Sequence, residues 1–311
     1  MKKRAIISLL VSLIVMSVIL PALATESPEN VETPEPVSAE AEPEPETEQE
    51  PEPEAFIYLD GTPQFLEYEL INGTTYVTVD SFVAMMDPQA VVEEADGAAA
   101  VSSVRMGQIV DAEGNTADVV QETLSMAVSV QVPYIVANGR YFYVRDSLIM
   151  LNGHVAAPIR VLTKVFNLDV DYNGTVLLTS GQDRSAYIQP GDSYYNGDTL
   201  YWLSHIIFAE SGNQSLEGKI AVGNVVMNRV NDSQFPNNIY DVLYQENQFY
   251  PVSSGSIWDT PNEESVVAAK LVMDGTQIVP TALFFNTVYV SSFASRNRPY
   301  ITTIGAHAFY S

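Results

Sequence analysis

The chain has 311 residues and a formal net charge of −25, with 39 acidic residues against 14 basic ones. This charge argues against nucleic acid as a partner, because binding to phosphates relies on lysine and arginine. The absence of cysteine excludes disulfides, thiol nucleophiles and thiolate metal ligands. The three histidines, His154, His205 and His307, lie in separate segments without metal-ligand spacing. The sequence therefore predicts no metal site and no cofactor.

Residues 1–24 have the pattern of a secretory signal peptide. Lys2-Lys3-Arg4 precedes an apolar run from Ala5 to Leu20, and Ala22-Leu23-Ala24 forms an A-x-A cleavage site. Cleavage after Ala24 removes three basic residues and no acids, so the charge of −25 becomes −28. We expect a secreted, cell-wall-associated protein with no stable membrane insertion after cleavage. The alternative is an uncleaved form tethered by the apolar run.

Residues 25–55 are predicted to be a disordered linker. The segment contains twelve glutamates, many alternating with proline, and no lysine or arginine. Such a segment buries too little apolar surface to fold, and its charge and proline keep it extended. It is interpreted as a spacer that holds the folded part away from the membrane, or as a passive solubilising tail.

Residues 56–182 are predicted to form a β-rich domain. Short β-prone runs are joined by pairs of Asn or Asp with Gly, which are typical of tight hairpin turns. These pairs are Asp60-Gly61, Asn72-Gly73, Asn138-Gly139 and Asn152-Gly153.

A rough internal repeat follows two of these turns. In the first copy we expect a strand at Tyr76–Val79, a helix at Ser81–Met86, a strand near Ala90–Glu94 and a turn at Asp96-Gly97. In the second copy we expect a strand at Val155–Pro158, a helix at Arg160–Phe166 and strands at Leu168–Tyr172 and Thr175–Thr179.

The second copy, HVAAPIRVLTKVFNLDVDYNGTVLLTS, resembles the copper amine oxidase N-terminal-like domain, and the first copy matches it more weakly. In that family the module is non-catalytic and recurs on secreted bacterial surface enzymes. The resemblance implies an α+β stalk. Nothing in the segment supplies a copper site, and His154 and Arg160 are interpreted as surface or core polar residues.

Residues 193–311 are predicted to form a second, α-rich domain. Asp198 to Glu210 has the pattern of a helix with Asp198 as its N-cap, ended by Ser211-Gly212-Asn213. Glu210 falls inside the apolar arc of this helix and at its negative C-terminal pole. Both features raise the pKa of a carboxyl group, as a general acid requires. The alternative is a solvent-facing glutamate on a frayed last turn.

Later segments supply a core and candidate substrate-binding residues. Ser215 is predicted to cap a buried helix at Leu216–Val230, in which Gly223 lets another helix approach. Further helices are expected at Ile239–Tyr244 and Glu263–Met273, and Leu283–Asn286 is too short to assign. Aromatic and amide side chains are dense in the loops and suit a groove that stacks on sugar rings, although ordinary packing explains many of them. They are Gln248, Phe249, Tyr250, Trp258, Phe284, Phe285, Asn286 and Tyr289.

From Asp198 to Tyr310 the chain resembles the SleB/CwlJ-type bacterial cell wall hydrolase family. The matching blocks are Phe208-Ala209-Glu210, Leu216–Val222, Val226–Val230, Gln248-Phe249 with Pro251-Val252, Phe284-Phe285-Asn286 and Ile304–Tyr310. The resemblance implies a lysozyme-like catalytic domain, peptidoglycan glycan strands as the partner and Glu210 as the catalytic acid. It also implicates Gln248, Phe249, Phe285, Asn286 and His307 in substrate binding. A lone histidine in an apolar segment such as that of His307 is more often a structural residue than a catalytic one.

Two residues depart from the pattern of this family. Gln214 stands where a second acidic residue is usual, and Asn286-Thr287 replaces Asn-Pro. Spore-cortex specificity does not carry over from the resemblance, because the family also occurs on ordinary cell-wall enzymes.

The implied reaction is cleavage of the β-1,4 bond between N-acetylmuramic acid and N-acetylglucosamine. A water-using glycosidase normally pairs two carboxyl groups, whereas a lytic transglycosylase needs one acid/base. No other acid has a spacing that pairs it with Glu210, so we favour the transglycosylase. The alternatives are a water-using muramidase or amidase and an inactive peptidoglycan-binding surface protein. The products of peptidoglycan digestion distinguish these possibilities. Anhydro-sugars indicate the transglycosylase, reducing sugars the muramidase and free peptides the amidase, while an absence of new ends indicates the binding protein.

Overall fold

The computed structural model describes residues 56–110, 116–181 and 186–311. By its contacts the chain divides into Met1–Glu52 and Pro53–Ser311, and all described residues lie in the second unit. The predicted signal peptide and linker fall outside the described residues. Within the described ranges, no helix has the length and apolar character needed to cross a membrane.

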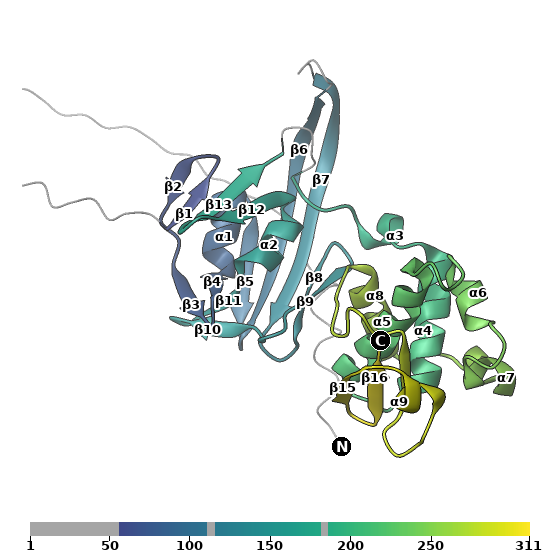
Figure 1. Ribbon diagram of the computed structural model, residues 1–311. Coiled ribbons are helices and arrows are strands. Elements are labelled where there is room, and N and C mark those ends of the chain that lie inside the picture. The colour runs from purple at the N-terminus through teal and green to yellow at the C-terminus, as the bar shows by residue number, and fades with distance from the viewer. Residues whose placement is uncertain (1–55, 111–115, 182–185) are drawn as a thin grey trace, which may run out of the picture. The chain divides into compact units, whose positions relative to one another are not determined.

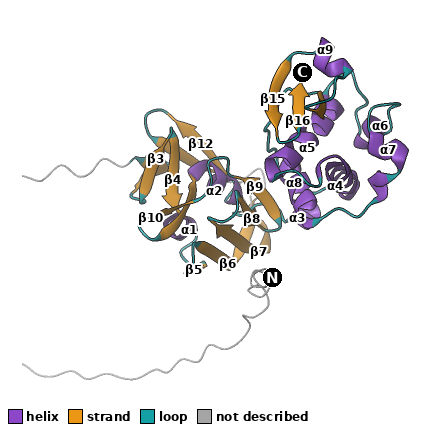
Figure 2. Cartoon of the chain, turned by 90° about the horizontal axis from the view of Figure 1, so that it is seen from below, coloured by secondary structure: helices purple, strands orange, loops and turns teal. Residues whose placement is uncertain are grey.

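The first part of the second unit is built mainly of strands (Figures 1 and 2). Its elements are β1 (Ile57–Leu59), β2 (Thr62–Gln64), β3 (Tyr68–Ile71), β4 (Thr74–Thr78), α1 (Val79–Met86), β5 (Val91–Ala95), β6 (Ala98–Val110), β7 (Thr116–Ser129), β8 (Tyr134–Ala137), β9 (Arg140–Tyr143), β10 (Ile149–Leu151), β11 (His154–Pro158), α2 (Ile159–Val165), β12 (Leu168–Tyr172) and β13 (Val176–Ser180).

The predicted hairpin turns are confirmed. In each of the four pairs, both residues have a positive φ, as at Asn72 with φ 49° and Gly73 with φ 78°. Two consecutive left-handed residues make the turn whose twist matches that of paired strands. Asparagine, aspartate and glycine tolerate this conformation, and this explains why their sequence positions locate the turns.

The internal repeat is also confirmed. Each copy runs strand, helix, strand, as β4-α1-β5 in the first and β11-α2-β12 in the second. The two copies meet where β4 pairs antiparallel with β11, in a four-stranded sheet of order β10-β11-β4-β3. The buried face of this pair is apolar, with Val77 and Ala157 opposite each other and fully buried.

Two further sheets complete this part. One has the order β12-β13-β1-β2, in which β1 and β13 are parallel. The other has the order β5-β6-β7-β8-β9 and contains the long β6–β7 hairpin, which the sequence did not predict. In the described ranges β6 pairs with β5 only up to Ser102, and beyond it with β7 alone. There Arg105 lies opposite Glu122, with Nε 3.0 Å from Oε2.

The second part is helix-rich with a small sheet (Figure 2). Its elements are α3 (Gly191–Tyr194), α4 (Gly197–Ser211), α5 (Leu216–Asn231), α6 (Ile239–Leu243), α7 (Tyr250–Ser254), the 3₁₀ turn η2 (Ser256–Trp258), α8 (Glu263–Met273), β14 (Phe284–Thr287), α9 (Phe293–Asn297), β15 (Tyr300–Ile304) and β16 (His307–Tyr310). The three strands form a sheet of order β14-β16-β15. The helices therefore agree with the α-rich expectation, while the sheet is an addition to it. The division at residue 193 and the stalk and lysozyme-like assignments stay predictions.

The helix that carries Glu210 begins two residues earlier than expected. Asn196, not Asp198, is the N-cap of α4, because its side-chain oxygen accepts a hydrogen bond from the backbone N–H of Thr199 at 2.9 Å. Asp198 lies inside the first turn, where a carboxylate still interacts favourably with the helix dipole. The predicted cap of α5 is confirmed, since Ser215 accepts from the N–H of Gly218.

Gly223 sets the packing of three helices. A side chain at this position of α5 would lie 2.9 Å from Ile207 Cδ1 in α4 and 2.9 Å from Val272 Cγ2 in α8. Both distances are well inside van der Waals contact, so α4 and α8 approach α5 only because residue 223 has no side chain. Ile207 is fully buried in this contact.

We expect Gly223→Val to lower the free energy of unfolding by about 1–3 kcal/mol, because the added methyl groups overpack the junction of the three helices. Urea unfolding of the purified variant measures this difference. Gly197→Val is the matched control, since residue 197 lies at the start of α4 with no atom within 4 Å of the added carbon. Equal stability of the two variants would contradict the packing role of Gly223.

Candidate active site

Glu210 lies in the last turn of α4 and is half-buried. Leu203, Ile206 and Ile207, the apolar residues predicted to share its side of the helix, are fully buried. Within the described ranges, the Glu210 carboxyl has neither a hydrogen bond nor an ion pair to another side chain. The Glu210 carboxyl is therefore largely desolvated, while part of the residue remains exposed and open to a ligand.

Burial raises the pKa of Glu210 to about 7, from an ordinary value of 4.5. Desolvation is the one cause, and no neighbouring charge contributes. A carboxyl group with this pKa is partly protonated near neutral pH and can both donate and accept a proton. The direction of the shift is the expected one, and its cause is burial, without a contribution from the helix dipole that was also expected.

The connection between α4 and α5 is fixed by Gln214 and Lys219. The Gln214 Oε1 accepts a hydrogen bond from the backbone N–H of Ala306 at 2.9 Å, and its Nε2 donates to Asn213 Oδ1. The buried Lys219 Nζ donates to the Gln214 carbonyl at 2.6 Å and pairs with Glu264 at 2.5 Å. Gln214, a departure from the family pattern, thus ties the end of the Glu210 helix to the turn before β16.

His307 is the first residue of β16 and is 7% exposed. Its ring meets Phe285 edge-on, with centroids 5.3 Å apart and planes at 81°. Burial lowers the pKa of His307, so the imidazole is neutral near pH 7. Its Nδ1 is buried without a hydrogen-bond partner in the described ranges. Gln214 and Ala306 bring this ring toward the end of α4, but no hydrogen bond joins it to Glu210 there.

Phe285 and Asn286 lie side by side on β14, and their roles differ. Phe285 is half-buried between His307 and Phe309. The Asn286 amide donates to the carbonyl of Val290 at 3.1 Å, and its oxygen accepts from Ser292 Oγ at 2.7 Å. Its amide also donates to the Thr287 carbonyl at 2.8 Å, so Asn286 shapes the loop that follows β14.

Gln248 and Phe249 lie against Arg229. The exposed Gln248 accepts a hydrogen bond from Arg229 Nη1 at 3.1 Å. Phe249 is 5% exposed and has the Arg229 guanidinium 5.1 Å from its ring centre. Little of the Phe249 ring is open for stacking on a sugar, so its contribution would be to hold Gln248 and Arg229 in place. None of the five predicted substrate-binding side chains hydrogen-bonds to Glu210 in the described ranges.

Three polar residues of α5 support this region in a way the sequence did not reveal. Asn224 bonds to the backbone of Thr276, Ile278 and Val279, and Asn228 donates to the carbonyls of Val279 and Ala282. Arg229 Nε donates to the carbonyl of Leu283 at 2.7 Å. These bonds satisfy the backbone of the loop that leads into β14 and so place Phe285. The sequence signal for two of them was the four-residue spacing of Asn224 and Asn228 inside an otherwise apolar helix.

An aromatic cluster on α4, α6 and η2 was also missed. Trp202 meets Trp258 at 5.5 Å and Tyr240 at 5.4 Å, and Tyr240 stacks on Tyr244 at 4.3 Å with planes at 19°. Trp258 is 60% exposed and Tyr240 46%. The stacked pair is spaced four residues apart, with Tyr240 in α6 and Tyr244 as its C-cap, a signal that the sequence did contain.

The C-terminal part of the chain is similar to known proteins. Residues 213–310 match the family described as Cell Wall Hydrolase. The chain is 31% identical over 116 residues to the spore cortex-lytic enzyme of Bacillus cereus, and 30% identical over 138 residues to that of Bacillus subtilis. These alignments cover 37% and 44% of the chain, and it spans about 45% of the length of both relatives.

The solved structures to which the chain is similar include that of the catalytic domain of the Bacillus cereus SleB protein. It is 29% identical, with a TM-score of 0.36, over 38% of this chain and 92% of the other. The family match confirms the predicted resemblance for the C-terminal part. The matched residues begin just after Glu210, at residue 213, so the role of Glu210 is not part of that match.

The raised pKa of Glu210 predicts a pH-dependent difference in stability between the wild type and Glu210→Gln. A carboxyl whose folded pKa exceeds its unfolded value weakens folding as it ionises, so the wild type loses stability between pH 4.5 and about 7. The difference in unfolding free energy should be near zero at pH 4 and on the order of 2–3 kcal/mol in favour of Gln at pH 8.

Urea unfolding of both proteins across this pH range measures the difference. Glu246→Gln, at an exposed position of the same part, is the control for loss of one negative charge. A constant difference between wild type and Glu210→Gln from pH 4 to 8 would show that the Glu210 carboxyl is not desolvated in solution.

Proposed function

We propose that this protein, whose residues 213–310 form a cell wall hydrolase domain, cleaves the glycan strands of peptidoglycan as a lytic transglycosylase. Glu210 is the acid/base. The observation that carries the proposal is a half-buried carboxyl with a pKa of about 7 and no charged neighbour, at the helix end that leads into the matched domain. The alignments with spore cortex-lytic enzymes support peptidoglycan as the substrate class.

The reaction begins with proton transfer from Glu210 to the oxygen of the β-1,4 bond between N-acetylmuramic acid and N-acetylglucosamine. The bond from this oxygen to the anomeric carbon breaks as positive charge develops on that carbon. The resulting Glu210 carboxylate then takes the proton of the muramic acid 6-hydroxyl, whose oxygen bonds to the same carbon and closes a 1,6-anhydro ring. A single group with a pKa near the working pH suits both proton transfers.

The lack of an acidic partner favours this route over a water-using muramidase. An inverting or retaining glycosidase needs a second carboxyl group within roughly 5–10 Å of the first. No acidic side chain contributes to the pKa of Glu210, as a carboxylate at the near end of that range would. Gln214, at the position where the family pattern expects an acid, is engaged with Ala306 and cannot act as a general base.

The other groups would bind and orient the glycan. Phe285 and the neutral His307 are proposed to contact the sugars, while Gln248, Phe249 and Asn286 hold the surrounding surface. A glycan substrate in the wall also implies that the chain works outside the cytoplasm. This location is consistent with the proposed signal peptide at residues 1–24. The glutamate- and proline-rich residues 25–55 would then be a spacer and residues 56–182 a stalk.

Glu210→Gln should abolish glycan cleavage while the protein stays folded, because glutamine has nearly the same shape and cannot donate the proton. The loss should be at least about 10²–10⁴-fold, the usual contribution of general acid catalysis. Mass spectrometry of digested peptidoglycan measures it, with Glu246→Gln as the charge-matched control.

The same experiment identifies the reaction. Anhydro-muramic ends support the transglycosylase, whereas reducing ends would assign a muramidase and free stem peptides an amidase. Wild-type turnover by folded Glu210→Gln would exclude Glu210 as the acid. Binding to peptidoglycan without any new ends would assign an inactive binding protein.

His307→Gln should reduce turnover more than it reduces thermal stability, if the neutral imidazole orients the substrate. Glutamine keeps a hydrogen-bonding group at a buried strand position but loses the ring that meets Phe285. Turnover and melting temperature are measured on the same purified variant. A lower melting temperature with unchanged turnover per folded molecule would assign His307 a structural role only.

A further inference from the structure

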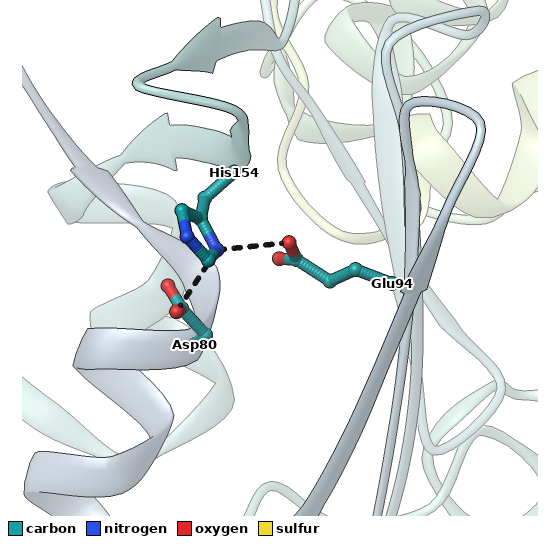
Figure 3. Close-up of side chains that lie close together, drawn as sticks. All are labelled: Asp80, Glu94 and His154. Atoms are coloured by element: carbon teal, nitrogen blue, oxygen red, sulfur yellow. Dashed lines mark hydrogen bonds and ion pairs between the residues drawn. The ribbon is translucent and has the colours of Figure 1, made fainter.

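Three chemically distinct side chains from separate elements meet in the β-rich part of the chain. Asp80 lies in the first turn of α1, Glu94 on β5 and His154 at the start of β11. Figure 3 shows the His154 ring directed at both carboxylates. Their candidate ligand atoms all lie within 4.8 Å of one another, and each side chain keeps part of its surface open to solvent.

The spacing of the three groups suits a small divalent cation. The His154 Nδ1 is 3.1 Å from Asp80 Oδ2 and 3.1 Å from Glu94 Oε2. Ligand atoms at the usual zinc distances of about 2.0–2.2 Å, arranged tetrahedrally, lie roughly 3.4 Å apart. Small rotations of these side chains would therefore seat a cation among the three atoms, with solvent supplying a fourth ligand.

Each of the two carboxylates also has one oxygen without a hydrogen-bond partner in the described ranges. These oxygens, Asp80 Oδ1 and Glu94 Oε1, are both inaccessible to solvent. The only basic group found against the two carboxylates there is His154 itself. Two carboxylates thus share one imidazole, which leaves the cluster with excess negative charge, and buried oxygens without partners are costly. A divalent cation would neutralise that charge.

We propose that Asp80, Glu94 and His154 bind a divalent transition-metal ion, with Zn²⁺ as the best fit. Nitrogen together with carboxylate oxygen suits Zn²⁺, whereas Ca²⁺ and Mg²⁺ prefer all-oxygen sites. The expectation of no metal site rested on the spacing of histidines along the chain. The fold instead joins residues that are 14 and 60 positions apart in sequence.

The bound ion would link the two copies of the repeat. Asp80 and Glu94 belong to the first copy, and His154 to the second. Two of the three equivalent positions lack the ligand: Thr74 begins β4 where His154 begins β11, and Arg160 follows the first residue of α2 as Asp80 follows that of α1. Asp171 on β12 matches Glu94 on β5 and is the one acid retained. The cluster is therefore a specific addition to one end of a duplicated framework, where a metal would clamp α1, β5 and β11 together.

The test uses the full chain in metal-free buffer, titrated with ZnCl₂ by calorimetry and followed by thermal unfolding. We expect one tight site and a raised melting temperature, because a ligand that binds only the folded state stabilises it. Glu94→Gln and His154→Gln should each weaken binding by at least about 10-fold, since even outer-shell changes cost about 10–100-fold. Glu93→Gln, an exposed neighbour on the same strand, should leave tight binding unchanged.

Four results would overturn the proposal. They are no tight Zn²⁺ site, equal Zn²⁺ affinity in the wild type and both ligand variants, an equal loss in Glu93→Gln, and Ca²⁺ binding as tight as Zn²⁺ binding. Lower melting temperatures of both ligand variants in metal-free buffer, with unchanged Zn²⁺ affinity, would identify His154 as a bridge between carboxylates. None of these results depends on glycan cleavage.

Discussion

The hydrogen bond from the Ala306 backbone to the Gln214 side chain holds the C-terminal sheet against the helices. It joins the four-residue connection between α4 and α5 to the turn between β15 and β16. Gly305 permits it, because a side chain there would collide with the Gln214 oxygen and because its φ is 55°. This contact therefore links the segment just after Glu210 to the turn just before His307.

Two buried charges in this part are treated differently. The Lys219 ammonium is 1% exposed and is paired with Glu264 and a backbone carbonyl, so its burial is compensated. Glu210 is also desolvated but has no partner in the described ranges, and its pKa is raised accordingly. A charge that serves the architecture is neutralised by its neighbours, whereas a proton donor has to stay poorly solvated. The contrast between these two residues is physical support for a functional role of Glu210.

Local sequence patterns predicted much of the secondary structure. The helix at Glu263–Met273 has the predicted bounds, and the Asn-Gly turns lie where φ must be positive. The N-cap of α4 was misassigned because Asn196 and Asp198 are both suitable caps, and backbone geometry chooses between them. The β14–β16 pairing depends on partners distant in sequence, which periodicity does not reveal.

The same distinction applies to the sites. Glu210 was found because a charged residue inside an apolar helical stripe is visible in one segment. The Asp80, Glu94 and His154 cluster was not found, since it exists only after β4 and β11 pair and bring the two copies together. The interpretation of His154 as a surface or core polar residue was reasonable for an isolated histidine. Its two acidic neighbours give it a different chemical context.

The pairing register of the long β6–β7 hairpin is fixed by a contact between its own side chains. Beyond Ser102 the neighbouring β5 no longer constrains β6, so two strands could slip past each other. The Glu122 carboxylate binds Arg105 with one oxygen and the backbone N–H of Ala186 with the other. It lies across Gly107, where any side chain would meet it at 2.6 Å. The absence of a side chain at Gly107 thus leaves the space in which one carboxylate bonds both to Arg105 across the hairpin and to the backbone of Ala186.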